Sequence, residues 1–82
     1  GIYPVGSLVR LSNQRLAVVV AQNPSQLLKP VVKTVYSLRS QEPLVPQRID
    51  LSAAGCAVQI EQREDPAVWK IPNLDAVWQE EL

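Results

Sequence analysis

Ser7-Leu-Val-Arg-Leu11 and Arg15-Leu-Ala-Val-Val-Val-Ala21 decide the fold of this 82-residue chain, together with the Ser12-Asn13-Gln14 connection between them. The second stretch is apolar on both alternating faces, which predicts a central strand covered on both sides. The connection is short enough only for a hairpin. Tight hairpin turns need positive φ values that suit glycine, so Gln14 predicts either a strained left-handed residue or a longer, looser turn.

Three further segments have strand character. The segment 31–37 is rich in β-branched residues and alternates, which predicts that Val35 and Tyr36 face opposite sides. The segment 45–51 contains Pro46, which cannot donate a backbone hydrogen bond, so this strand is predicted either to lie at an edge or to begin outside the sheet. The segment 57–62 alternates between apolar and polar residues. The predicted core consists of Val9, Leu11, Leu16, Val18, Val20, Val35, Ile49, Val58 and Ile60.

The spacing of these segments predicts the fold class. Short strands at roughly 10-residue intervals are typical of a small all-β domain, here a five-stranded antiparallel SH3-like barrel or curved sheet. Asp65-Pro66 combines an N-cap with a proline at the first helical position, so a short helix should begin there. We therefore expect a small β-barrel over residues 1–63 and a short helical tail over 64–82 that packs on the barrel.

Charge divides the chain in two. Residues 1–48 hold six basic groups and one acidic group, a net charge of +5. Residues 49–82 hold two basic and seven acidic groups, a net charge of −5. The acidic part either folds back on the basic part or docks on another domain or subunit. The first alternative is favoured because it requires no partner.

The composition excludes most catalytic chemistry. The chain has no His and one Cys. An imidazole base, a His-ligated metal, an internal disulfide and a zinc site with two or more Cys ligands are therefore excluded. We expect no catalytic residue, no metal ligand and no cofactor in this segment. Cys56 is expected to be a small buried residue, and Glu61, Glu64 and Asp65 a solvated strand end with a helix cap rather than a weak divalent-metal site.

Composition also bears on the setting of the chain. No apolar run approaches the about 20 residues that span a bilayer, so no membrane segment is expected. A chain without disulfides fits the cytoplasm. The sequence begins at Gly1 and contains no Met, so we expect a fragment of a larger protein.

A possible interaction surface remains. Nucleic-acid binding by a small β-barrel is the alternative function, but bases stack on aromatic side chains, and the first 60 residues offer only Tyr3 and Tyr36. A solvated basic face is therefore favoured and nucleic acid is not an expected partner. Trp69 is expected to pin the C-terminal segment onto the barrel, whereas Trp78 is as well explained as a protein-binding anchor. The candidate residues are Arg10, Arg15, Lys33, Arg39, Arg48, Trp69 and Trp78.

Several stretches carry a resemblance to a known family. They are Tyr3-Pro-Val-Gly-Ser-Leu-Val-Arg-Leu-Ser-Asn13, Leu16-Ala-Val-Val-Val20, Asn23-Pro24, Leu28-Lys-Pro-Val-Val-Lys33, Val45-Pro46 and Ile49-Asp50-Leu51. Together they resemble, over about residues 1 to 52, the segment that follows the catalytic domain in bacterial HD-GYP phosphohydrolases, which are cyclic di-GMP phosphodiesterase-like enzymes. The family commonly has Gly where this chain has Gln14, a departure that concerns the hairpin.

The resemblance implies an enzymatic parent and a non-enzymatic segment. The family's metal ligands, its His-Asp pair and its Gly-Tyr-Pro motif lie upstream, and Gly1-Ile2-Tyr3-Pro4 is not that motif. The implied role is that of a C-terminal accessory domain for packing, assembly or regulation. The expected partners are the rest of the parent chain and another copy of the protein. A cyclic di-GMP sensor is a further alternative. Such a sensor would require paired Arg residues to bind phosphate, and no close Arg pair occurs in the sequence.

Overall fold

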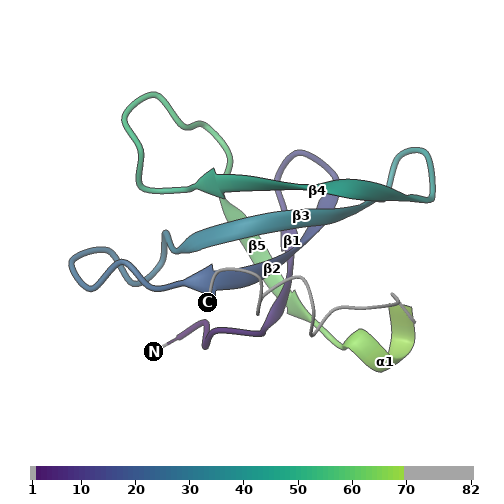
Figure 1. Cartoon of the computed structure of the whole chain (residues 1–82), viewed down its shortest axis with the longest axis horizontal. Coiled ribbons are helices and arrows are strands. Elements are labelled where there is room, and N and C mark those ends of the chain that lie inside the picture. Colours follow the sequence, from purple (N-terminus) through teal and green to yellow (C-terminus); the bar gives the residue numbers. More distant parts are fainter. Residues whose placement is uncertain (1, 70–82) are drawn as a thin grey trace.

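The structure, a computed structural model, describes residues 2–69. It is all-β apart from one short helix, as predicted (Figure 1). The elements are β1 (Leu8–Leu11), β2 (Arg15–Ala21), β3 (Val31–Ser37), β4 (Glu42–Asp50), β5 (Ile60–Glu64) and α1 (Pro66–Trp69). The predicted strands 45–51 and 57–62 are shifted, because β4 begins at Glu42 and β5 begins at Ile60. Residues 70–82, which make up most of the predicted helical tail, lie outside the described residues.

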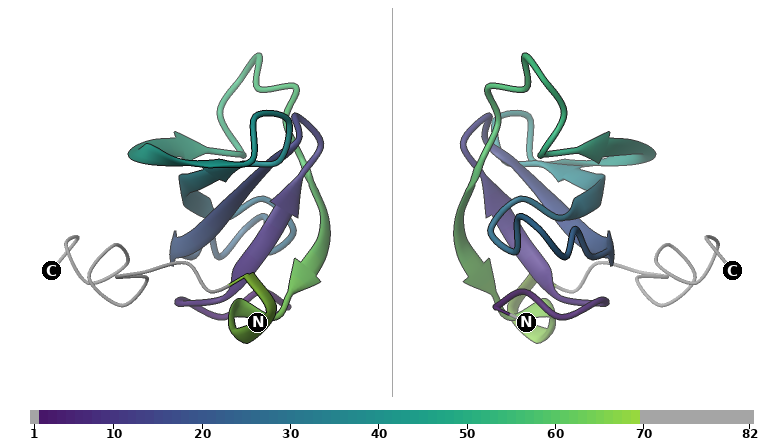
Figure 2. Two further views of the ribbon diagram at one scale, coloured as in Figure 1. Left: turned by 90° about the vertical axis from the view of Figure 1, so that its right-hand side faces the viewer. Right: turned by 90° about the vertical axis from the view of Figure 1, so that its left-hand side faces the viewer.

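All strand pairs are antiparallel, in the order β4-β3-β2-β1-β5. The strand direction turns steadily from β4 to β5, so the sheet is strongly curved (Figure 2). Within residues 2–69, β4 and β5 are its two edges and do not pair with each other. The part of the chain that the structure describes is therefore an open, curved five-stranded sheet.

The β1–β2 hairpin contains the conformation predicted for Gln14. Arg10 pairs with Leu16, and the Gln14 amide donates to the Leu11 carbonyl at 3.2 Å. Gln14 has a φ of 64°, in the left-handed region. This arrangement matches the three-residue hairpin loop, in which a turn is followed by one left-handed residue. Gln14 thus occupies a position that glycine fills at lower conformational cost.

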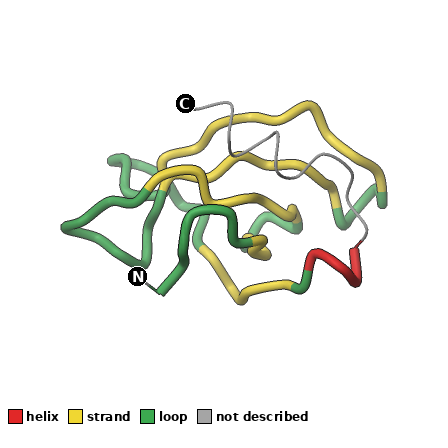
Figure 3. The backbone as a smooth tube through the Cα atoms, turned by 60° about the horizontal axis from the view of Figure 1, so that its bottom comes forward, coloured by secondary structure: helices red, strands yellow, loops and turns green. Residues whose placement is uncertain are grey.

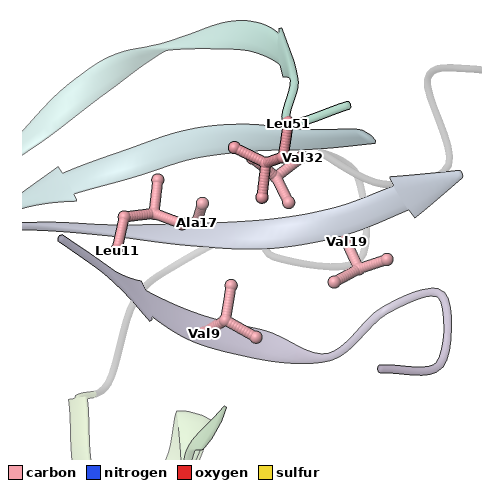
Figure 4. Packing of buried hydrophobic residues seen from close by; sticks show 6 residues of the cluster. All are labelled: Val9, Leu11, Ala17, Val19, Val32 and Leu51. Atoms are coloured by element: carbon pink, nitrogen blue, oxygen red, sulfur yellow. The ribbon is translucent and has the colours of Figure 1, made fainter. Parts of the chain in front are cut away.

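The central strand β2 is covered on both faces, as its sequence predicts. A first cluster of buried side chains comprises Val9, Leu11, Ala17, Val19, Val32 and Leu51 (Figure 4). A second cluster, formed on the other face of β2 by alternate residues, comprises Leu8, Leu16, Val18 and Val35. Since successive side chains of a strand point to opposite faces, a run apolar at every position supplies both clusters.

Three predicted core residues are only half-buried. Ile49, Val58 and Ile60 pack against the first cluster from its periphery. Edge strands and the connecting segment have neighbours on fewer sides, so hydrophobic alternation there overestimates burial. Leu51 is 1% exposed instead. It lies just after β4, where its amide donates to the Pro30 carbonyl at 3.2 Å.

Irregular pairing changes the faces predicted for β3. Leu16 pairs with Tyr36 and Ala17 with Thr34, which leaves Val35 as an extra residue in a bulge. Both Val35 and Tyr36 therefore pack at the second cluster, and the prediction that they face opposite sides is wrong.

The edge position predicted for the Pro46 strand is confirmed. Thr34 pairs with Gln47, and Tyr36 pairs with Pro43, so residues 44–46 bulge out of the ladder. Pro46 lies within this bulge and Val45 is 89% exposed there. Proline has no N–H to donate. Within this bulge no ladder hydrogen bond is required of Pro46.

Candidate interaction surface

Among residues 2–69, no group of three or more His, Cys, Asp or Glu side chains is placed to hold a metal ion. Cys56 is half-buried beside the first cluster, and its thiol contacts the Val58 carbonyl at 3.6 Å. The helix present in this part of the chain is not long and apolar enough to cross a membrane.

Trp69 is engaged within the chain. It packs against the second cluster from α1, which begins beside the end of β5 (Figure 3). Its ring centroid lies 5.9 Å from that of Tyr36, with the planes tilted by 51°. The indole Nε1 donates to Glu64 Oε1 at 3.0 Å. These contacts hold α1 on the sheet. Trp78 lies outside the described residues.

Arg10 is also engaged, through Glu64. Its Nε lies 3.1 Å from Glu64 Oε2, which also accepts a hydrogen bond from the Gln62 amide at 2.7 Å. The hydrogen bond from Trp69 lowers the pKa of Glu64, assisted by Gln62 and Arg10 and opposed by burial. Arg10 belongs to the basic part of the chain and Glu64 to the acidic part. This ion pair therefore joins the two oppositely charged parts.

Lys33 and Arg48 form a pair of basic residues on β3 and β4. They stand directly opposite each other across β3 and β4. Both have interaction partners of their own. Like charges in opposed strand positions repel, so such a pair needs neighbouring groups to offset it. The basic residues thus do not form one continuous row along the described sheet.

Arg15 and Arg39 are brought to one cavity of about 340 Å³. The β1–β2 and β3–β4 turns lie side by side at one end of the sheet (Figure 2). The Leu38 amide donates to the Gln14 carbonyl at 2.9 Å, and Arg39 Nε donates to Gln14 Oε1 at 3.4 Å. The cavity is lined by Ser12, Asn13, Gln14, Arg15, Ser37 and Arg39. The pairing of Arg15 with Ser37 is the signal that would have revealed this site.

Asn23 braces a loop whose role the sequence did not indicate. Its Nδ2 lies 2.6 Å from the Lys29 carbonyl, 3.1 Å from Asp50 Oδ1 and 3.2 Å from Ser52 Oγ. Hydrogen bonds from the side chain and backbone of Ser52 lower the pKa of Asp50, and Asn23 contributes in the same direction. These contacts tie residues 22–30 to the end of β4.

The braced loop carries two adjacent exposed apolar side chains. Leu27 is 43% exposed and Leu28 is 59% exposed. Both follow Asn23-Pro24 within a stretch whose ends are fixed at Asn23 and at Pro30, which is buried. An apolar pair on a constrained loop suits contact with another protein surface better than a singly exposed residue does.

Comparison with known proteins gives one informative relative. The chain is 46% identical over 78 residues to a Pseudomonas aeruginosa protein named cyclic di-GMP phosphodiesterase PA4108. The match covers 95% of this chain but only 19% of that protein's length. No protein-family model matches the chain. No solved structure matches it either.

The match confirms the resemblance identified in the sequence and widens it. The stretches quoted for that resemblance end near residue 52, whereas the match covers 95% of the chain. The matched region therefore extends into the acidic part of the chain, residues 49–82. Asn23 and Asp50, which belong to the resembling stretches, are bonded to each other through Nδ2 and Oδ1. Part of the resemblance thus consists of residues that brace the fold.

Proposed function

We propose that this chain is a non-catalytic C-terminal accessory domain of an HD-GYP-type cyclic di-GMP phosphodiesterase, with a small SH3-like fold. Its role is to pack on the rest of a cytoplasmic parent chain and to support assembly. The observation that carries the proposal is 46% identity across 95% of this chain to 19% of a cyclic di-GMP phosphodiesterase. The absence of His from the sequence supports a role outside the metal-dependent hydrolysis that the family performs.

The apolar pair Leu27 and Leu28 is the packing surface in this proposal. The Asn23 contacts constrain the loop before it meets a partner, so less conformational entropy is lost on docking. The engagement of Trp69 and Arg10 within the chain supports the choice of this loop over the candidates named from sequence.

The test uses the full-length parent with three changes. The first deletes this segment, the second is the double variant Leu27→Ser/Leu28→Ser, and the third is Val45→Ser, a control at the 89% exposed position on β4. Metal content, turnover per metal-loaded site, solubility and oligomeric state are measured for each. The deletion and the double variant should lower solubility or assembly while turnover per loaded site persists. Val45→Ser should leave all four readouts unchanged.

Two outcomes would overturn the proposal. Loss of turnover with normal metal content, folding and assembly would mean that the segment takes part in catalysis. Unchanged solubility and assembly in both the deletion and the double variant would remove the packing role. Salt-sensitive binding of oligonucleotides by the intact chain would instead support the nucleic-acid alternative, because phosphate contacts release counterions.

A further inference from the structure

We propose that the cavity between the β1–β2 and β3–β4 turns binds the phosphate group of a small ligand. Its two cationic side chains, Arg15 and Arg39, lie 24 positions apart in the sequence, and β2–β3 pairing brings them together. The inference concerns this chain alone and does not depend on the nature of a parent protein.

The lining residues supply donors suited to a phosphate. Guanidinium groups form forked hydrogen bonds that match phosphate oxygens. The Ser12 hydroxyl oxygen accepts from the Gln59 amide, and the Ser37 hydroxyl oxygen accepts from the Ser40 amide. An oxygen occupied as an acceptor leaves the hydroxyl hydrogen to be donated elsewhere. Two arginines and two serines therefore line the same open pocket, and a tetrahedral anion has an oxygen for each of them.

The two arginines are partly positioned by contacts within the chain. The exposed Arg39 side chain contacts Gln14, its Nε donating to Gln14 Oε1 at 3.4 Å. Arg15 is half-buried at the start of β2. Fixing such side chains in advance reduces the entropy lost on binding. A volume of about 340 Å³ is near the lower end of ligand pockets, which suits a small molecule.

The charges around the cavity are unbalanced. Within residues 2–69, neither Arg15 nor Arg39 forms an ion pair with a carboxylate. The lining contains no acidic residue. Glu42 stands opposite Ser37 on β4, outside the lining. By strand register it is an acidic group next to the lining, and it gives the experiment a variant that should act in the opposite direction.

The experiment titrates the complete ¹⁵N-labelled chain at constant ionic strength with inorganic phosphate, adenosine 5′-monophosphate and adenosine. Resonances of Arg15 and Arg39 Nε–H and of the Ser12–Arg15 amides are followed by NMR. The two phosphate-bearing probes should give saturable shifts at these resonances, and adenosine should give none. Similar affinities would assign recognition to the phosphate alone. Tighter binding of the nucleotide would identify a nucleotide as the ligand class.

Variants separate a built site from general positive charge. Arg15→Gln and Arg39→Gln should each weaken phosphate binding by about tenfold, the scale of one lost charge-assisted hydrogen bond. Arg39→Lys should recover only part of that loss, because an ammonium cannot form the fork. Arg63→Gln, which removes the same charge from β5, should change binding by less than twofold. Glu42→Gln should strengthen binding about twofold by removing nearby negative charge.

Three results would overturn the proposal. The first is shifts that grow linearly without saturation. The second is equal weakening by Arg63→Gln and Arg15→Gln in variants whose amide spectra show the native fold. The third is binding of a single-stranded oligonucleotide, but of neither small phosphate probe, through Lys33 and Arg48. That result would assign the basic residues to nucleic acid.

Discussion

At the scale of single residues, Gln14 holds a conformation that its side chain disfavours. Its φ is 64°, and glycine adopts this region without the Cβ penalty. Gln14→Gly should therefore raise the free energy of unfolding by about 0.5–1 kcal/mol, measured by urea denaturation of the complete chain. The same variant should weaken phosphate binding, because Arg39 loses its acceptor. Gln47→Gly, in the extended strand β4, should destabilise, and equal stability of Gln14→Gly and the unaltered chain would contradict the strain.

Asn23, in contrast to Gln14, is a polar residue whose contacts stabilise the fold. Asn23→Ala removes the donor shared among the Lys29 carbonyl, Asp50 and Ser52. We expect a loss of about 0.5–1 kcal/mol of unfolding free energy, the net contribution of a hydrogen bond whose acceptors are mostly exposed and only at Ser52 half-buried. Asn13→Ala, in the exposed turn, should stay within about 0.5 kcal/mol. Thermal or urea unfolding compares the two, and equal effects would mean that the loop is not braced through Asn23.

At the scale of elements, α1 is held on the sheet by an ionised carboxylate. The pKa of Glu64 is lowered, chiefly by the Trp69 indole hydrogen bond, so its ionised form favours the folded contact. That stabilisation is complete above the ordinary Glu value of about 4.3 and is lost as pH falls through the lowered pKa. In a Trp78→Phe background, Trp69 fluorescence should shift to the red across this acidic range.

Two variants identify the group that titrates. Glu64→Gln should abolish the acidic transition in Trp69 emission, because the amide keeps an acceptor oxygen but has no proton to gain. Asp50→Asn removes the other carboxylate with a lowered pKa, which lies at the end of β4, and should leave the transition in place. A transition that survives in Glu64→Gln would show that another group controls α1.

The secondary-structure elements are the part of the fold that the sequence predicts best. The alternating runs specified five strands, the central position of β2 and the edge position of the Pro46 strand. The failures occur at irregular pairing. Nothing in the 31–37 run marks Val35 as the extra residue of a bulge, because the bulge depends on how β3 meets β2 and β4 together. Strand ends moved for a related reason: Ser12 and Gln59 bond outside the regular ladder before β5 begins.

At the scale of the whole molecule, the candidate site could not be predicted because its residues lie far apart in the sequence. The sequence named Arg15 and Arg39 separately, and their meeting at one cavity required the Arg15–Ser37 register. The sequence showed a basic part and an acidic part of the chain, and the ion pair between Arg10 and Glu64 joins the two. The proposed packing surface at Leu27 and Leu28 was not predicted, because the sequence does not show whether an apolar pair in a short loop is exposed or buried.

The strand order also has a kinetic consequence. β1 to β4 each pair with their neighbour along the chain, whereas β5 returns to β1, with Gln59 and Ser12 bonded across 47 positions. Hairpins close within about 1–10 μs, whereas distant segments must first overcome the entropy of a long loop. We therefore expect the four-stranded meander to form first and β5 to dock last. Until it docks, Val9 and Leu11 lack the cover of Val58 and Ile60, and a nascent chain halted in this interval is at its greatest risk of aggregation.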